Sequence, residues 1–266
     1  MTYLSDTHCH IHDSEFFPEG GDAPYLRARE AGVPRVMVVG TDLRSSREAV
    51  AFAHTHDNVY AVVGIHPHEA TTEASYVADI RNLAQQHHAE PWFAGIGEIG
   101  LDYFYLHSPR ELQQQMLREQ LDIAAEFGLP VSFHVRNSKE PGSTSVFDDF
   151  WPIFDAYDGL RGVLHSFTDT LSNMQVGLSK GLYVGLNGIS TFATDVTKTV
   201  GVSPLDRILF ETDAPYLTPK PHRGKINEPM YIRDIALFHA KQRGLSLEDI
   251  AAATEQNFER LFFAGK

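Results

Sequence analysis

The sequence predicts an α/β protein of the (β/α)8 TIM-barrel class, with residues 1–266 forming a single barrel domain. Eight short apolar or β-branched segments alternate with longer segments of helical periodicity, a pattern typical of parallel strands joined by helical crossovers. The length of 266 residues is ordinary for such a barrel. No G-x-G-x-x-G pattern follows the first strand, which disfavours the alternative of an open, doubly wound sheet.

The strands are expected where runs of Val, Ile, Leu and aromatic residues stand between turn-forming residues. In chain order these segments are Tyr3–Cys9, Arg35–Thr41, Val59–Ile65, Trp92–Glu98, Pro130–Val135, Gly162–Ser166, Leu182–Gly185 and Arg207–Thr212.

The clearest helix is expected over residues 108–127, directly after the fourth strand. Ser108 is the expected N-cap, Pro109 suits the first helical position, and Glu111 would complete a capping box. Gly128 then provides the C-terminal stop before the fifth strand.

Two further helices follow the eighth strand, over residues 228–243 and 246–263, and we expect them to close the barrel. Ser246 begins the second of them in the same way as Ser108 begins its helix, with acidic residues in the first turn.

Composition and charge restrict the classes of function. The net charge of −13 argues against a broad basic face for duplex nucleic acid, because such binding neutralises many phosphates. An anionic substrate would therefore be held locally, by a few cationic side chains or by metal ions. The single cysteine allows no intrachain disulfide. Neither a signal-peptide pattern nor an apolar run of about 20 residues is present, so we expect a cytoplasmic protein without a membrane segment or an obligate protein partner.

Metal-capable side chains stand at the ends of six predicted strands. The carboxyl ends of barrel strands form the active-site face in this fold, so these side chains are expected to converge there. They are His8 and His10 (first strand), His66 (third), Glu98 (fourth), His134 (fifth), His165 (sixth) and Asp213 (eighth). By contrast, the histidines on helical segments fit solvated faces and receive no role; these are His54, His56, His87, His88 and His239.

The first strand ends in Asp6-Thr7-His8-Cys9-His10, where alternation of side chains places His8 and His10 on one face. Asp6 is expected on that same face and Cys9 on the opposite one, so Cys9 is predicted to pack rather than to take part in chemistry.

Six ligands exceed what one ion normally takes from a protein, so the sequence predicts two divalent ions per chain. The predicted metal ligands are His8, His10, Glu98, His134, His165 and Asp213. Four imidazoles with two carboxylates suit Zn²⁺ or Mn²⁺ and, less well, Mg²⁺. Paired ions favour hydrolysis, most naturally of a phosphoester.

With these motifs the sequence resembles the TatD-type metal-dependent deoxyribonucleases of the amidohydrolase superfamily. The resemblance covers residues 6–227 in family order, in seven stretches: Asp6–His10, Gly64–His68, Gly97–Tyr103, Pro130–Arg136, His165–Phe167, Glu211–Leu217 and Arg223–Asn227. Two local departures follow His165 and Arg136: Ser166 stands where the family often has Cys or Gly, and Asn137-Ser138 where it usually has an acidic residue and Ala.

The resemblance implies a barrel of the metallo-dependent hydrolase type with a two-metal site and 3′–5′ exonuclease or related DNase activity. It implies that His8, His10 and Asp213 hold one ion, that His134 and His165 hold the other, and that Glu98 bridges them. The expected substrate is single-stranded DNA or another nucleic-acid end.

The expected mechanism uses a water molecule activated by the two ions, with Asp213 orienting it and accepting its proton. His66 is expected to contact the phosphate or to protonate the leaving oxygen, so the predicted catalytic residues are Asp213, Glu98 and His66. The candidates for substrate binding are His66, Arg136, Arg223 and Lys225.

Two supporting roles are also expected. Glu211 lies inward by strand parity and is either a support for a metal ligand or a buried structural carboxylate. Four aromatic residues near the mouth are candidates for stacking on a terminal base, with loop packing as the alternative: Tyr103, Phe104, Tyr105 and Tyr216.

Two alternative functions remain open at the level of sequence. The same centre could remove a D-amino acid from tRNA or cleave a small ester or lactone. A non-catalytic binding protein is disfavoured because the ligand set is complete.

Overall fold

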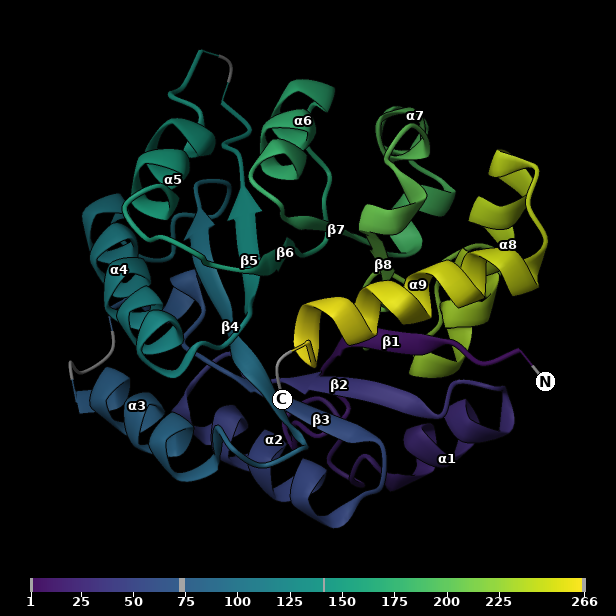
Figure 1. The fold of residues 1–266 in the computed structure, drawn as a ribbon, viewed down its shortest axis with the longest axis horizontal. Coiled ribbons are helices and arrows are strands. Elements are labelled where there is room, and N and C mark those ends of the chain that lie inside the picture. Colours follow the sequence, from purple (N-terminus) through teal and green to yellow (C-terminus); the bar gives the residue numbers. More distant parts are fainter. Residues whose placement is uncertain (1, 72–74, 141, 265–266) are drawn as a thin grey trace.

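Eight parallel strands form the centre of the molecule, and their order in space is their order in the chain (Figure 1). The computed structural model describes residues 2–71, 75–140 and 142–264. The strands are β1 (Ser5–Cys9), β2 (Arg35–Val39), β3 (Val59–Val63), β4 (Phe93–Asp102), β5 (Val131–Arg136), β6 (Gly162–Leu164), β7 (Tyr183–Leu186) and β8 (Ile208–Phe210).

Helices surround this sheet on the outside (Figure 1). They are α1 (Asp22–Glu30), α2 (Leu43–Thr55), α3 (Ser75–His87), α4 (Arg110–Phe127), α5 (Val146–Phe154), α6 (Leu171–Ser179), α7 (Thr194–Gly201), α8 (Ile232–Arg243) and α9 (Leu247–Phe262). Four short 3₁₀ turns are η1 (Pro67–Glu69), η2 (Gly188–Thr191), η3 (Leu205–Arg207) and η4 (Pro229–Tyr231). The predicted (β/α)8 barrel is therefore confirmed. Within the described ranges, every helix is too short or too polar to cross a bilayer.

The barrel closes through the residues that follow β8. The Asp213 N–H donates to the His8 carbonyl, and the His10 N–H donates to the Ala214 carbonyl, each at 2.8 Å. The Asp6 carboxylate adds to this closure by accepting a hydrogen bond of 2.8 Å from the Thr212 N–H. These contacts place the end of β1 directly beside Asp213, although the two lie about 200 residues apart in the chain.

Two layers of apolar side chains fill the structure. One lies inside the barrel and includes Met37, Val39, Val62 and Leu209, and the other lies between strands and helices. Helix α9 covers the end of the barrel at which the strands begin, where Arg35 of β2 forms ion pairs with Glu255 and Glu259 of α9. The opposite end, where the strands finish, is left for the functional site.

Strand β4 extends four residues beyond the predicted end at Glu98. Its pairing with β5 shifts register between Ile96 and Ile99, because three residues of β4 span the distance of two on β5. Such a bulge redirects side chains locally. Glu98 therefore lies within the strand rather than at its end, and Asp102 takes the end position.

The predicted N-cap of the helix after β4 is wrong. Helix α4 begins at Arg110 after Pro109, without a side-chain cap. The Ser108 hydroxyl instead donates to the His68 carbonyl at 2.7 Å, which ties this loop to η1. Two other predicted ends are confirmed: Gly128 adopts the left-handed conformation at the C-cap of α4, and Ser246 caps α9 through the Asp249 N–H. The helix expected over residues 228–243 begins later, at Ile232, because η4 precedes it.

The prediction that His239 lies on a solvated face is also wrong, since the side chain is fully buried in α8. Its Nε2 lies 2.8 Å from the Ser190 Oγ, and the Ser190 hydroxyl donates to the Asn187 carbonyl at 2.6 Å. His239 is therefore the donor, with its proton on Nε2, and Nδ1 is buried without a partner among the described residues. Burial, followed by the charge of Arg243, lowers the pKa of His239 to about 3.

We predict that His239→Gln flattens the acid limb of the stability curve. The folded pKa of about 3 is below the ordinary value of 6.5, so stability is lost as the pH falls from 6.5 toward 3, where only the unfolded chain binds the proton. Between pH 7 and pH 5 the native protein should lose about 2 kcal/mol more than the variant. Urea unfolding of the metal-free proteins at both pH values measures this difference. His54→Gln, at an exposed position on α2, is the control and should retain the native slope.

Candidate metal centre

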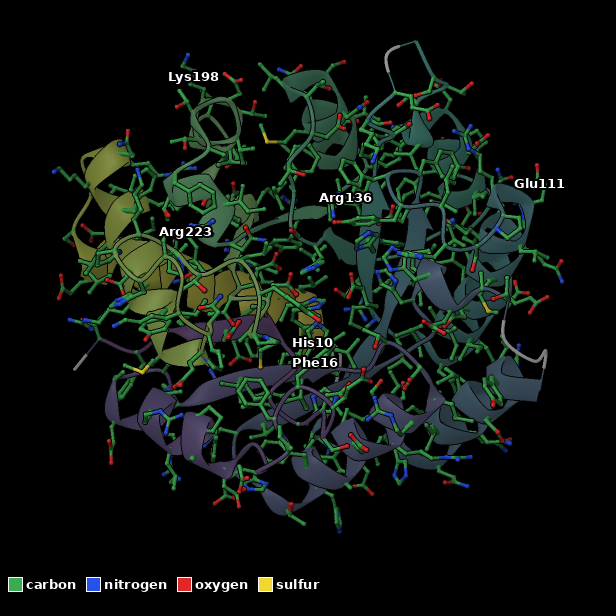
Figure 2. All side chains as sticks on the ribbon, turned by 180° about the vertical axis from the view of Figure 1, so that it is seen from behind. His10, Phe16, Glu111, Arg136, Lys198 and Arg223 are labelled. Atoms are coloured by element: carbon green, nitrogen blue, oxygen red, sulfur yellow. The ribbon has the colours of Figure 1, made fainter. Side chains whose placement is uncertain are left out.

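A cavity of about 500 Å³ opens at the end of the barrel where the strands finish. Residues from the segments after all eight strands line it, from His10 after β1 to Tyr216 after β8. Figure 2 shows this face, with His10 near the centre and Arg136 on one side of it. A deep cavity with contributions from every strand is where this fold places its active site.

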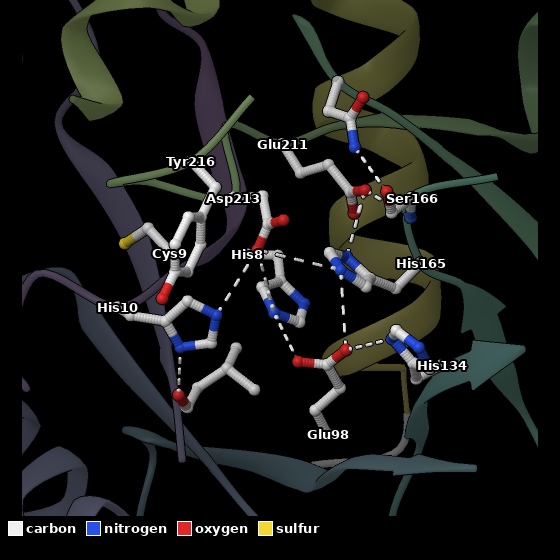
Figure 3. Close-up of polar contacts among 12 residues, drawn as sticks. His8, Cys9, His10, Glu98, His134, His165, Ser166, Glu211, Asp213 and Tyr216 are labelled. Carbon is white, nitrogen blue, oxygen red and sulfur yellow. Dashed lines mark hydrogen bonds and ion pairs between the residues drawn. The ribbon is translucent and has the colours of Figure 1, made fainter. Parts of the chain in front are cut away.

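The six predicted metal ligands meet at the base of this cavity, where the histidines surround Glu98 and Asp213 (Figure 3). Glu98 Oε2 lies 3.4 Å from His8 Nε2, and Glu98 Oε1 lies 2.6 Å from His134 Nδ1 and 3.7 Å from His165 Nε2. Asp213 Oδ1 lies 3.3 Å from His10 Nε2. All six side chains are buried or nearly so.

Three of the four histidines present Nε2 to the centre because the protein engages their other nitrogen. His8 Nδ1 lies 3.2 Å from the Ser132 hydroxyl, and His10 Nδ1 lies 2.7 Å from the Val39 carbonyl. His165 Nδ1 lies 3.0 Å from Glu211 Oε1. A ring that donates its Nδ1–H to a fixed acceptor has a lone pair on Nε2, which is the arrangement of a metal-binding histidine.

The fourth histidine is held in the opposite sense. His134 Nε2 lies 2.9 Å from Asp102 Oδ2, while its Nδ1 faces Glu98. Burial disfavours a charged ring, but Asp102 and Glu98 raise the pKa of His134 to about 9. A cation at Nδ1 would replace the proton there and leave the Nε2–H donating to Asp102.

A divalent cation fits this donor set. His8 Nε2 is buried and lacks a hydrogen-bond partner among the described residues, although two carboxylates lie within 4 Å of it. Unpaired buried nitrogen next to buried carboxylate is costly unless a cation joins them. Three groups have ligand atoms close enough to share an ion: His8 with His10 and Glu98, His8 with His165 and Glu211, and His66 with Glu98 and His134.

The hydrogen bonds select among these groups. Glu211 Oε1 is occupied by His165 Nδ1 and by the Ser166 N–H, so Glu211 supports a ligand rather than serving as one. His66 Nδ1 accepts a hydrogen bond of 3.2 Å from the His68 N–H, which leaves the ring proton on Nε2. His66 Nε2 lies 3.4 Å from Glu98 Oε1, so this neutral histidine faces the centre as a donor.

Electrostatics without a cation show how strongly charged the centre is. Burial alone would raise the pKa of Glu98, but His66, His165 and His134 together hold it well below its ordinary value. Burial disfavours a charged His165, yet Glu211 and Glu98 raise its pKa to about 10. The carboxylates are thus ionised and favour protonation of His10, His134 and His165, whose pKa values are raised, whereas burial lowers the pKa of His8 and of His66. A bound cation would replace those protons.

In the motif Asp6–His10, the two histidines point to the centre but Asp6 does not. His8 and His10 face the centre and Cys9 points away, with its Sγ donating to the Met37 carbonyl. The pairing of β1 with β2 shifts register between Asp6 and Cys9, so simple alternation fails there. Asp6 consequently bonds to Thr212 and stays out of the histidine cluster.

Asp102 is a buried carboxylate of the site that the sequence did not lead us to expect. It is fully buried and contacts both His134 and His68. The distance from Asp102 Oδ2 to His68 Nε2 is 3.1 Å. A signal was present, because Asp102 is four residues from Glu98 and so shares its face on an extended strand. The assumption that the fourth strand ends at Glu98 concealed it.

The predicted phosphate-binding cations differ in position. Arg136 lines the cavity, with its guanidinium 4.2 Å from the Phe104 ring and 5.0 Å from the Tyr105 ring. Arg223 lies outside the lining, above Phe192 at 4.0 Å, and Lys225 is exposed beside it. His66 lies in the lining.

A second arginine of the lining, Arg44, is already neutralised. It forms ion pairs with Asp13 and Glu48 at 2.9 Å and with Glu15 at 3.4 Å. Its charge is thus offset by protein carboxylates, which leaves Arg136 as the cation of the lining that is available to an anionic ligand among the described residues.

Aromatic side chains at the mouth fall into two classes. Tyr103 is fully buried and donates its hydroxyl to Asp149 at 2.7 Å, so of its two predicted roles the packing alternative applies. Tyr105 and Tyr216 are about half exposed, at 51% and 48%, and both line the cavity. Phe104 is partly buried beneath Arg136.

Comparison with known proteins gives a consistent result. A family model described as TatD related DNase matches residues 5–263. The chain is 33% identical to an uncharacterized metal-dependent hydrolase, YabD, of Bacillus subtilis, over 97% of this chain and 98% of that one. It is 34% identical to the 3′-5′ ssDNA/RNA exonuclease TatD of Erwinia tasmaniensis, over 92% and 95%. The crystal structure of YJJV, a TatD homolog from Escherichia coli, superposes with a TM-score of 0.87 at 26% identity, covering 97% of both chains.

Proposed function

The chain belongs to the TatD-related DNase family and is a metal-dependent hydrolase, and we propose that it is a 3′–5′ exonuclease acting on single-stranded nucleic acid. The observation that supports this proposal is the convergence of four histidines and two carboxylates, Glu98 and Asp213, at the base of one cavity. A relative that covers nearly the whole chain is named as an exonuclease of this kind.

The proposed centre holds two divalent ions, Zn²⁺, Mn²⁺ or Mg²⁺. His8, His10 and Asp213 would bind one, His134 and His165 the other, and Glu98 both. Such ions lower the pKa of water and neutralise charge on a phosphoryl group.

The protein's own side chains would then move protons and hold the substrate. The Asp213 carboxylate orients the attacking water and accepts its proton. His66 points its Nε2–H into the cavity and donates it to an oxygen of the phosphodiester, which stabilises charge that develops during attack.

Arg136 is the proposed phosphate ligand inside the cavity, because it is held over aromatic rings and is not neutralised by a carboxylate among the described residues. Arg223 and Lys225, outside the cavity, would bind the strand further from its end. Tyr105 and Tyr216 are placed to stack on a terminal base. A local grip of this kind agrees with a net charge of −13, since no long duplex has to be held.

The test combines metal analysis with a nuclease assay. Chelated protein is reconstituted separately with Zn²⁺, Mn²⁺ and Mg²⁺, and bound metal is counted after desalting. We expect two ions per chain and stepwise shortening of a 5′-labelled single strand, and a 3′-terminal phosphorothioate should block the shortening. A D-aminoacyl-tRNA and a simple lactone are tested in parallel. Protein that carries two ions but leaves the strand intact, with or without hydrolysis of these esters, would overturn the proposal.

A further inference from the structure

Asp102 contacts two histidines of the cavity through a single oxygen atom. Its Oδ2 lies 2.9 Å from His134 Nε2 and 3.1 Å from His68 Nε2. His134 Nε2 donates to this oxygen, whereas His68 Nε2 lies at ion-pair distance without the alignment of a hydrogen bond. One buried charge therefore favours a proton on the facing nitrogen of both rings.

The carboxylate itself is firmly held. Its Oδ1 accepts hydrogen bonds from the Phe104 and Tyr105 N–H groups at 2.8 and 2.9 Å. The backbone of Asp102 is bound on both sides by the buried amide of Gln113, which accepts from its N–H at 2.7 Å and donates to its carbonyl at 3.0 Å. The Asp102 carboxylate is therefore held in one position at the end of β4.

Asp102 is also connected to His66, through contacts of His68. The His68 ring faces Asp102 at ion-pair distance. The His68 carbonyl accepts a hydrogen bond from Ser108, and its backbone N–H donates to His66 Nδ1. The last of these bonds keeps the His66 proton on Nε2, where it faces the cavity.

We propose that Asp102 is a positioning residue which sets the proton positions of the proposed metal ligand His134 and, through His68, of the proposed substrate donor His66. The assignment of His134 and His66 to these roles rests on the proposed function. Asp102 is not one of the proposed ligands of the ions or of the substrate. Its contribution is to hold a proton on His134 Nε2, so that Nδ1 is the nitrogen left for a cation, and to help hold a proton on His66 Nε2.

The decisive variant is Asp102→Asn. The amide oxygen can retain the two bonds from Phe104 and Tyr105, and the amide nitrogen then faces His134 and His68. Because an amide nitrogen donates, His134 must give up its Nε2 proton and carry it on Nδ1, toward Glu98. The shape is preserved and only the proton position changes.

Metal titration of chelated protein with Zn²⁺ alone, in the absence of nucleic acid, measures the effect. We expect the affinity for one of the two ions to fall by about 10- to 100-fold in Asp102→Asn, with the other changed by less than about threefold. Asp149→Asn is the matched control, since Asp149 accepts a bond from Tyr103 in the same region and contacts no histidine of the centre. Native affinity for both ions in Asp102→Asn would overturn the proposal.

A second measurement depends on the native protein alone. In the zinc-loaded protein with ¹⁵N-labelled histidine, the His134 signal, identified by its loss in His134→Gln, should show its proton on Nε2. A proton on Nδ1 instead would overturn the proposal even if Asp102→Asn failed to fold. Both measurements are made without substrate, so their failure is distinct from a failure to degrade nucleic acid.

Discussion

Replacing Glu98 with Gln should lower kcat/KM for single-stranded DNA by about 10³-fold or more, or about 4 kcal/mol. Glu98 is the acidic residue that faces His8, His66, His134 and His165 together. Its neutral isostere keeps the volume and removes the charge, so the cluster of imidazoles loses its central anion. Bound metal should accordingly fall below two ions per chain.

Activity and metal content are measured on the same samples. Glu255→Gln is the control, because Glu255 is partly buried and paired with Arg35 at the opposite end of the barrel. It should cost stability while leaving two ions and native kcat. If Glu98→Gln retained both ions and turned over within threefold of the native rate, the shared role of Glu98 would be refuted.

Convergence of the site was predictable because parallel strands of a barrel finish at one edge. A histidine or carboxylate immediately after an apolar run is therefore expected at that edge. This argument placed His8, His10, His165 and Asp213 correctly. No property of distant parts of the chain was needed, since each strand delivers its own residue.

Local departures from regular strand geometry could not be predicted in the same way. A bulge between Ile96 and Ile99 places Glu98 in the centre while the strand continues to Asp102. The extra residue of the bulge does not change the apolar periodicity by which a strand is recognised. The carboxylate of Asp102 at the end of the strand does not change it either. The proton positions on the rings of His66 and His134 follow from single hydrogen bonds, which sequence spacing does not encode.

Burial of a polar residue was similarly hidden. His239 stands at helical spacing from the apolar Ile232, Ile235 and Ala236 of α8, so periodicity indicates an inward position, but its polar side chain favoured the interpretation as a solvated residue. Its burial follows from contact of α8 with η2, where Ser190 supplies its partner. A contact between segments nearly 50 residues apart decides the environment, whereas helical periodicity reports only on the helix itself.

The second large effect is expected for Asp213→Asn, which should lower kcat by about 10³-fold with KM changed by less than about threefold. Asn cannot accept the proton of the attacking water, although its carbonyl oxygen can occupy the place of Oδ1 beside His10. The loss therefore falls on the chemical step rather than on binding. Pre-steady-state release of the first nucleotide measures that step directly.

Asn is a better choice than Ala at this position because Asp213 adopts a φ of 58°, in the left-handed region. Asn tolerates that conformation, while Ala should cost about 1–2 kcal/mol of stability in addition to the lost carboxylate. Asp213→Gly removes the side chain without this strain, so Gly and Ala should share the same low kcat and differ in Tm. If instead activity followed Tm across Asn, Gly and Ala, Asp213 would act through the backbone, and its assignment as proton acceptor would fail.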